Sequence, residues 1–333
     1  MDDIIERPDN ILSLPVDPLS LGQLDQAIVT QFIQRSVSEE TRRAYRRVTR
    51  QFFRFFRDRH PSAITPADIQ RWRDHLINAE QKPATVTFKL SVIRSLFDYL
   101  KVGGYISTNP ALTKLVPPPA LPDELRGKVL TPKEVRYLLA APARSVPEGA
   151  RDYTLMLLML RTGLRVSEAC SLKVSSIKWS HGRWVLRVKV KGGRERTIPL
   201  PKEVKQAIDE YLKLDNSRRT IHHCDGPEAF IFQPLTNYRT LTFNKPLSTT
   251  MVWHIVRRWS DYSGIGKLSP HDLRRTAITK ALDQGLTYRQ VQMMSGHKDP
   301  KTVMRYDHHR ENLDQNAVNF LNYDDDGNSS NQR

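Results

Sequence analysis

The stretch KLVPPPALPDELRGKVL, from Lys114 to Leu130, divides the sequence into two unlike halves. It contains Pro117, Pro118, Pro119 and Pro122, and such a density of proline favours an extended, semi-rigid segment. The whole chain has 333 residues, which is longer than a single hydrophobic core usually becomes. We therefore expect two domains joined by a linker at residues 116–129.

The half before this linker is predicted to be a small, basic, all-helical domain at residues 21–115, preceded by a flexible arm at residues 1–20. Its most informative segment is SEETRRAYRRVTRQFFRFFRDRH, which begins at Ser38, a candidate helix N-cap. At about 100° per residue, the apolar side chains of this segment fall on one stripe and the arginines fall opposite. The predicted apolar stripe comprises Tyr45, Val48, Phe52, Phe55 and Phe56.

The opposite face of the same helix is a row of arginines with almost no acidic residues. Solvated faces usually mix both signs of charge, so a face of one sign favours contact with phosphates over simple solvation. In the helix predicted after Pro83, two further basic residues lie off the apolar face and are assigned to the same function. The expected DNA-binding residues are thus Arg43, Arg46, Arg47, Arg50, Arg54, Lys89 and Arg94.

The overall charge points to the same kind of partner. The formal net charge is +16, and a soluble protein with such an excess usually meets a polyanion, although a basic protein without one is the alternative. The chain has 2 cysteines, Cys170 and Cys224, too few for a disulfide framework. It has no long apolar run and no signal peptide. We expect a protein of the bacterial cytoplasm or nucleoid, with no membrane association.

The half after the linker is expected to form a second domain at residues 130–323, followed by a disordered tail at 324–333. Capping boxes beginning at Thr131, Ser269 and Thr287 indicate further helices. The segment GRWVLRVKVKGGRERTIPL instead alternates apolar and polar residues and turns at a glycine pair, which predicts a β-hairpin with Lys191 at the lip of its turn. The fold class is therefore mainly α with a small β-hairpin or sheet.

Six residues of this half could form one site. Each has an ordinary explanation: a structural ion pair between Arg165 and Glu168, a solvent-facing turn lysine, a chance His-x-x-Arg pair, or a packing tyrosine. Taken together they suit a phosphodiester, because arginine forks bind phosphate oxygens, lysine can protonate a leaving oxygen and a tyrosine hydroxyl can attack phosphorus. The set, in chain order, is Arg165, Lys191, His271, Arg274, His297 and Tyr306.

The motifs TGLRVSEA, KVKGGRERTIPL, HDLRR and GHKDPKTVMRY resemble those of the tyrosine recombinases, or phage integrases, in order and spacing. The resemblance spans about residues 131–322, and the helical half is more loosely similar to the core-binding domain of that family. It implies that the two domains clamp DNA. It also implies Arg165 and Arg274 as the phosphate clamp, supported by Glu168, with Lys191 as general acid and Tyr306 as nucleophile. His271 and His297 match the two histidines of the family.

Two departures from the family pattern are visible. Arg275 occupies a position that is often histidine, and we expect this change to be neutral. No additional arm-binding domain is evident before residue 21, which argues against a lambda-like integrase with two DNA specificities.

The resemblance implies a site-specific DNA recombinase that works through a 3′-phosphotyrosine intermediate, without a cofactor, a metal or ATP. It further implies a homotetramer on a core DNA site, which we expect to contain an inverted repeat. The subunits would be joined by a C-terminal helix at 311–322. A type IB topoisomerase-like activity and a DNA-binding-only relative are the alternatives. The sequence leaves open the target site, the mobile genetic element or chromosome that it serves, and the choice among integration, excision, inversion and resolution.

Overall fold

The computed structural model describes residues 21–57, 59–120, 127–190, 194–235, 243–307 and 317–320. The chain divides into two compact units, Met1–Pro122 and Asp123–Arg333, and this division lies inside the proline-rich segment. They are called the N-terminal unit and the C-terminal unit below. In the described residues the fold is mainly helical with a small sheet, as the sequence predicts, and this sheet has a third strand beside the predicted hairpin.

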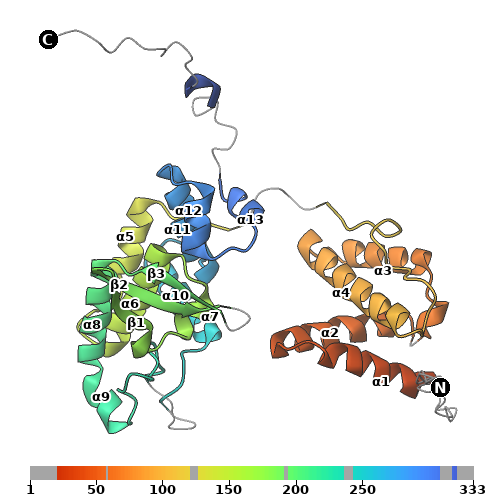
Figure 1. Cartoon of the computed structure of the whole chain (residues 1–333), viewed down its shortest axis with the longest axis horizontal. Coiled ribbons are helices and arrows are strands. Elements are labelled where there is room, and N and C mark those ends of the chain that lie inside the picture. The colour runs from red at the N-terminus through yellow and green to blue at the C-terminus, as the bar shows by residue number, and fades with distance from the viewer. Residues whose placement is uncertain are drawn as a thin grey trace, which may run out of the picture. The chain divides into compact units, whose positions relative to one another are not determined.

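In its described residues, the N-terminal unit has four α-helices that pack together (Figure 1). The ring of Phe52 lies at the centre of its core and makes edge contacts with the rings of Phe56, Trp72 and Phe97, at centroid distances of 4.9, 5.0 and 6.0 Å. Aromatic pairs with this geometry stabilise a core beyond the area that they bury. The helices are α1 (Leu21–Gln34), α2 (Glu39–Phe55), α3 (Pro66–Asn78) and α4 (Pro83–Val102).

The start of α2 is set by its predicted cap, because the Ser38 side chain accepts a hydrogen bond from the backbone of Thr41. The predicted apolar stripe is confirmed at Val48, Phe52 and Phe56, which are buried. It is wrong at Phe55, which is 38% exposed at the last residue of the helix. Phe55 lies three residues after Phe52, and this rotation of about 300° carries it to the edge of the stripe.

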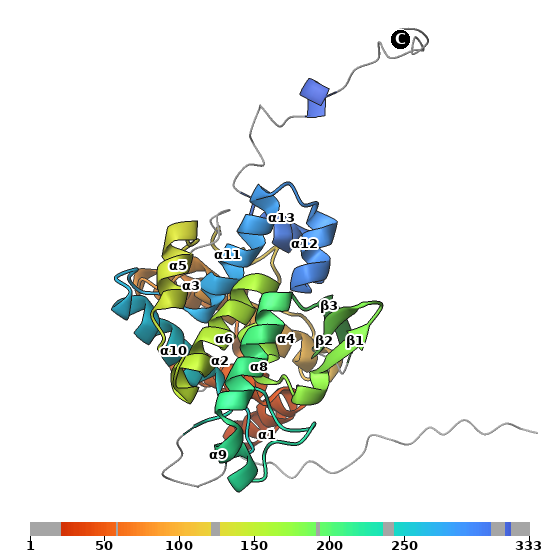
Figure 2. The same ribbon diagram turned by 90° about the vertical axis from the view of Figure 1, so that its left-hand side faces the viewer.

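The C-terminal unit is built around the buried helix α6 (Pro147–Thr162), which packs against α8 (Lys202–Leu214) and α11 (Pro270–Asp283). Figure 2 shows α11, α12 and α13 gathered at one end of this unit, with α9 at the other. The remaining elements are α5 (Pro132–Ala140), α7 (Val166–Cys170), β1 (Ile177–Ser180), β2 (Arg183–Lys189), β3 (Glu195–Pro199), α9 (Asn216–Ile221), α10 (Thr249–Tyr262), α12 (Tyr288–Ser295) and α13 (Pro300–Met304).

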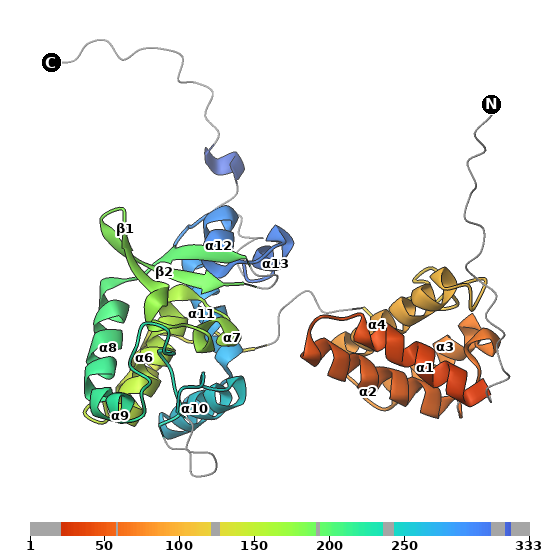
Figure 3. The same cartoon turned by 60° about the horizontal axis from the view of Figure 1, so that its bottom comes forward.

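The three strands form an antiparallel sheet in the order β1-β2-β3. Figure 3 shows β1 beside β2. Strands β2 and β3 are those of the predicted hairpin, and Leu186, Val188 and Ile198 turn their side chains into the core. Val190 N donates to Arg194 O at 2.8 Å and closes the neck of the hairpin. Lys191 and the two glycines of the turn lie outside the described residues.

The beginning of the C-terminal unit is tied to helix α11. Lys128 N donates to Asp272 Oδ1 at 3.0 Å, and Leu130 N donates to Thr276 Oγ1 at 3.0 Å. Gly127 adopts a φ of +136°, and a Cβ atom there would lie 2.7 Å from Asp272 Oδ1. Only glycine tolerates both the positive φ and the close approach of the Asp272 side chain. The chain therefore enters this unit along a path fixed by the first turns of α11.

Most of the C-terminal helix predicted at 311–322 lies outside the described residues, as do the predicted arm at 1–20 and the tail at 324–333. Within that predicted helix, Ala317–Phe320 is described and forms a 3₁₀ turn instead of an α-helical one. In the part of the chain that the structure describes, no helix combines the length and apolarity needed to cross a membrane.

Candidate active site

Five of the six predicted site residues are described, and the structure brings them together where α7, α11, α12 and α13 meet. Arg165 is the N-cap of α7, and His271 and Arg274 lie in the first turns of α11. His297 follows the end of α12, and Tyr306 follows α13. The position of Lys191, the sixth residue, stays a prediction.

Arg165 is held by Glu168. The backbone nitrogen and Nη1 of Arg165 each donate to the Glu168 carboxylate at 2.9 Å, while its Nη2 donates to Gly296 O at 3.2 Å. Burial alone would raise the pKa of Glu168, but the hydrogen bond from the Arg165 backbone and the charges of Arg196 and Arg165 outweigh it, so the pKa is lowered. The carboxylate is therefore ionised at neutral pH and fixes the first guanidinium.

Arg274 is almost completely buried, at 2% exposure. Its Nη1 donates to Gly163 O, the residue that ends α6 in a left-handed conformation, and its Nη2 lies 2.9 Å from His297 Nε2. Burial, followed by the positive charge of Arg165, lowers the pKa of Arg274 to about 10. The group still carries its charge at neutral pH, and both hydrogen-bond acceptors just named are neutral.

The protonation of His297 follows from its neighbours. A guanidinium has only donors, so His297 Nε2 must accept from Arg274, and the ring proton then lies on Nδ1, which donates to Ser295 Oγ at 2.9 Å. Burial first, and then the charges of Arg274 and Arg165, lower the pKa of His297 to about 4. His297 is therefore a neutral imidazole at physiological pH in the protein alone.

His271 lies close enough to this group to interact electrostatically with it. The residue is exposed, yet desolvation by the surrounding protein lowers its pKa, and the charges of Arg275 and Arg274 lower it further. Desolvation first, and then the same concentration of positive charge, lower the pKa of both predicted histidines.

Tyr306 is buried, with 2% of its surface exposed. It packs with Ile278, Val291 and Val303 in a small apolar cluster, and its ring centroid lies 5.8 Å from that of His297. The guanidinium carbon of Arg275 lies 5.5 Å from the centre of the Tyr306 ring. The structure thus places the predicted nucleophile beside the second histidine and close to the arginines.

Sequence reasoning missed one member of this group, Arg196 on β3. Its Nη2 lies 2.9 Å from Glu168 Oε2, so Glu168 lies between two guanidiniums. The alternation of side chains along a strand indicates its position, because Arg196 lies two residues before the inward-facing Ile198 and so on the same side of β3. The group therefore holds three arginines, Arg165, Arg196 and Arg274, and one carboxylate, an excess of positive charge that suits an oxyanion.

The predicted DNA-binding residues fall into two groups. The side chains of Arg43, Arg46, Arg47, Arg50 and Arg54 are all exposed on α2. Lys89 instead donates to the side chains of Gln51 and Gln81 at 2.6 and 2.7 Å. Arg94 donates to the backbone oxygens of Ala111 and Val116, both at 2.8 Å, which favours a role in holding this segment of the domain.

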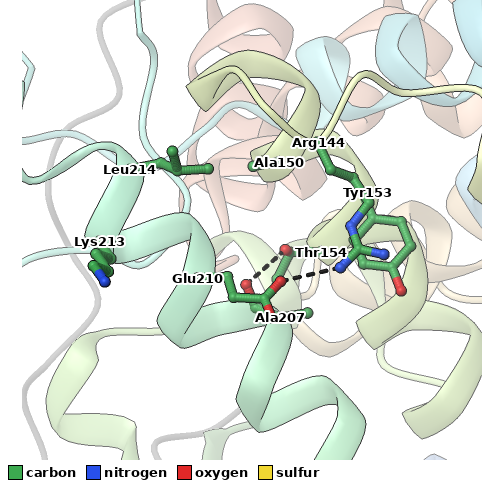
Figure 4. A pocket seen from close by; sticks show the side chains of 8 residues that line it. All are labelled: Arg144, Ala150, Tyr153, Thr154, Ala207, Glu210, Lys213 and Leu214. Carbon is green, nitrogen blue, oxygen red and sulfur yellow. Dashed lines mark hydrogen bonds and ion pairs between the residues drawn. The ribbon is translucent and has the colours of Figure 1, made fainter.

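A separate hollow of about 480 Å³ lies between α6 and α8 (Figure 4). Tyr153, Thr154 and Ala207 line it, and an ion pair between Arg144 and Glu210 runs along its edge at 3.0 Å. Thr154 lies two helical turns of α6, roughly 12 Å, before the end that holds Arg274. This hollow and the predicted site residues are therefore distinct features.

Protonation of His297 should destabilise the fold. The pKa of about 4 lies below the ordinary 6.5, so the unfolded chain takes up the proton first. The stability from this group is present above the ordinary pKa and is lost as pH falls through the window to about 4, by up to roughly 3 kcal/mol.

Urea unfolding of the full chain across this pH window tests the expectation. The variant His297→Gln, whose side-chain oxygen can still accept from Arg274, should lose stability less steeply than the wild type. His181→Gln, at an exposed turn between β1 and β2, should match the wild type. Equal slopes for wild type and His297→Gln would contradict the proposed neutral state of His297.

Comparison with known proteins identifies the family of the chain. Residues 128–312 match the model of the phage integrase family, and residues 30–104 match that of the phage integrase N-terminal SAM-like domain. Tyrosine recombinase XerD of Xanthomonas campestris pv. campestris is 32% identical over 90% of this chain and 92% of its own length. Tyrosine recombinase XerC of Thermodesulfovibrio yellowstonii is 30% identical over 85% of this chain and 92% of its own length.

Solved structures share the fold at lower identity. The XerH site-specific recombinase bound to palindromic difH substrate is 19% identical, covers 86% of this chain and 80% of its own, and has a TM-score of 0.67. A lambda integrase dimer bound to a core site is 21% identical, covers 87% of this chain and 95% of its own, and has a TM-score of 0.63. From these matches, this chain belongs to the phage integrase family, the tyrosine recombinases.

Proposed function

We propose that this site-specific recombinase cuts and rejoins double-stranded DNA through a covalent bond between the 3′ phosphate and Tyr306. The observation that carries the proposal is the group formed by Arg274, His297 and Tyr306, in which a buried guanidinium is hydrogen-bonded to a neutral imidazole whose ring centroid lies 5.8 Å from that of the tyrosine. Such a group has the charge to hold a phosphate and a hydroxyl to attack it.

In the proposed reaction, Tyr306 Oη forms a bond to phosphorus while the bond from phosphorus to the 5′ oxygen breaks. The phenolic proton passes to a base, for which the neutral His271 is the candidate, and the leaving 5′ oxygen takes a proton from Lys191. Arg165, Arg274 and His297 would hold the non-bridging oxygens and stabilise the charge that develops on them.

The chemistry is expected to need neither metal nor ATP. The arginines supply the cations that a metal would otherwise provide, and the phosphotyrosine conserves the energy of the broken phosphodiester. A 5′ hydroxyl from the partner duplex can then attack the phosphotyrosine, release Tyr306 and complete the strand exchange. This reversal needs no group beyond those that made the cut.

We assign DNA binding to both units, with the helical unit at 21–115 as the core-binding domain and residues 130–323 as the catalytic domain. The exposed arginines of α2 and the DNA-bound states of the XerH and lambda integrase structures support this assignment. Two duplexes have four strands to cut, so we propose a homotetramer on a core site with inverted repeats. The placement of the target sites in the DNA decides whether the reaction is an integration, an excision or a resolution.

Replacing Tyr306 by phenylalanine should abolish covalent attachment and leave DNA binding intact, since only one hydroxyl is lost. A suicide substrate, nicked near the cleavage point, traps the wild type as a covalent protein–DNA band. The matched control is Tyr262→Phe, a tyrosine that is 76% exposed on α10 and should react like the wild type. A covalent band of wild-type intensity from Tyr306→Phe would refute the assignment. A two-plasmid assay separates recombination from topoisomerase activity, which gives no recombinants.

Each exposed arginine of α2 should contribute one phosphate contact. Replacing Arg47 or Arg50 by alanine should weaken binding to all DNA sequences about equally and reduce the slope of log affinity against log salt by roughly one. The control is Arg144→Ala, an arginine paired with Glu210 beside the hollow between α6 and α8. An unchanged slope in the α2 variants would make that face a solvated one.

Residues after Asn312 should couple the subunits. If the segment docks on a neighbouring subunit, a chain truncated after Asn312 will bind one half-site normally but lose cooperative binding to the full site and all recombination. Band-shift titrations with half-site and full-site DNA measure the binding to one half-site and the cooperativity on the full site. Loss of half-site binding together with a lower melting temperature would instead place the segment in its own domain.

A further inference from the structure

Arg196 is a largely buried arginine that joins three elements of the C-terminal unit. Its side chain starts on β3, is 14% exposed and pairs with Glu168 of α7 at 2.9 Å. Its Nη1 donates to the backbone oxygens of Met294 and Met293, at 2.5 and 3.4 Å, in the last turn of α12. These carbonyls carry the negative end of the helix dipole, where a cation is favoured.

The same guanidinium lies against Gly296, the residue before His297. A Cβ atom on Gly296 would come within 2.8 Å of Arg196 Cζ, and the φ of +67° there also favours glycine. The carbonyl of Gly296 meanwhile accepts a hydrogen bond from Arg165. The turn that leads into His297 is therefore held between two guanidiniums, one against its Cα atom and one on its oxygen.

We propose that Arg196 is a positioning residue for DNA cleavage. It fastens the Gly296–His297 turn and the Arg165–Glu168 pair into one unit, so that Arg165, Arg274 and His297 meet the same phosphate. This inference rests on the function proposed above. It assigns Arg196 an indirect role, through the groups that it holds and not through contact with DNA.

The contacts require an arginine in particular. One nitrogen reaches the carboxylate of Glu168 while the other reaches the carbonyls of α12, in the two fixed directions of a planar fork. A lysine at this position would keep the charge but offer one nitrogen, which can serve only one side. The conservative variant Arg196→Lys should therefore cleave DNA about as slowly as Arg196→Ala.

The first experiment measures single-turnover cleavage of the suicide substrate at saturating protein. Cleavage by Arg196→Ala and Arg196→Lys should fall on the order of 100-fold, as expected when phosphate-binding groups are misplaced. Half-site affinity should stay within about twofold of the wild type. The control is Arg144→Ala, which also removes an arginine from a glutamate pair, but one that is 52% exposed on both sides.

A second substrate distinguishes between the groups that Arg196 could position, the phosphate-binding residues or the general acid Lys191. When sulfur replaces the bridging 5′ oxygen, the leaving thiolate needs no proton, so a defect in the acid step is relieved. Arg196→Ala should stay equally slow on both substrates, whereas Lys191→Ala should be rescued by sulfur. Rescue of Arg196→Ala would show that it acts through the hairpin turn that carries Lys191, and would overturn the proposal.

A double variant tests the contact with the turn itself. Gly296→Ala should slow cleavage in the wild type, partly through overlap with the Arg196 guanidinium and partly through backbone strain. In the Arg196→Ala background the overlap is gone, so the added alanine should slow cleavage by a smaller factor. Fully multiplicative effects would contradict a shared role.

Different outcomes would refute the proposed function and the role of Arg196. Absence of any covalent complex with the wild-type protein would refute the proposed function. Cleavage at the wild-type rate by Arg196→Ala, with the wild type active and Tyr306→Phe inactive, would refute the role of Arg196 alone. A variant that loses half-site affinity and melting temperature together with cleavage would show Arg196 to be merely structural.

Discussion

The candidate site depends on the two ion pairs that the buried carboxylate of Glu168 makes with Arg165 and Arg196. At 6% exposure it would be costly if it were unpaired, and two guanidiniums together with the Arg165 backbone satisfy it. In return, one anion determines where two cations lie. Helix α7, strand β3 and the turn before His297 are thereby fixed to one point.

The rest of the C-terminal unit places the remaining cation by backbone groups. Gly163, which ends α6, offers its carbonyl to Arg274, and Asp272 ties the start of α11 to the incoming chain at Lys128. A guanidinium held by a main-chain oxygen at a helix end can move little. Donors fixed before the substrate arrives do not have to be reorganised during reaction, which is the main source of electrostatic catalysis.

Local rules were enough to predict much of this architecture. The caps at Ser38, Thr131 and Thr287 are formed as expected, because each depends on side chains within one turn of the chain. The motif residues were found by resemblance, and their proximity follows from the fold. Lys191 lies outside the described residues, so its place in the site remains a prediction.

The predictions that failed, or were not made, concern residues whose environment is set by partners distant in sequence. Phe55 was assigned to the apolar stripe of α2 but is 38% exposed, because neighbouring helices do not cover that edge. Strand β1 was not expected, since its four residues pair as a strand only against β2. Arg196 lies inside the motif KVKGGRERTIPL, but the motif alone gives it no role, because its partners lie 28 and 98 residues away.

The burial of Tyr306 has a consequence for how such an enzyme would choose among DNA sites. If Tyr306 is the nucleophile, its ring must leave the cluster of Val291 and Val303 before it can react, which costs on the order of 2 kcal/mol of apolar contact. Binding energy from a matching sequence can offset this cost, while a mismatched sequence leaves the ring in place. Discrimination would then appear in the rate of the first cut more than in affinity, so the protein could occupy many chromosomal sequences without nicking them.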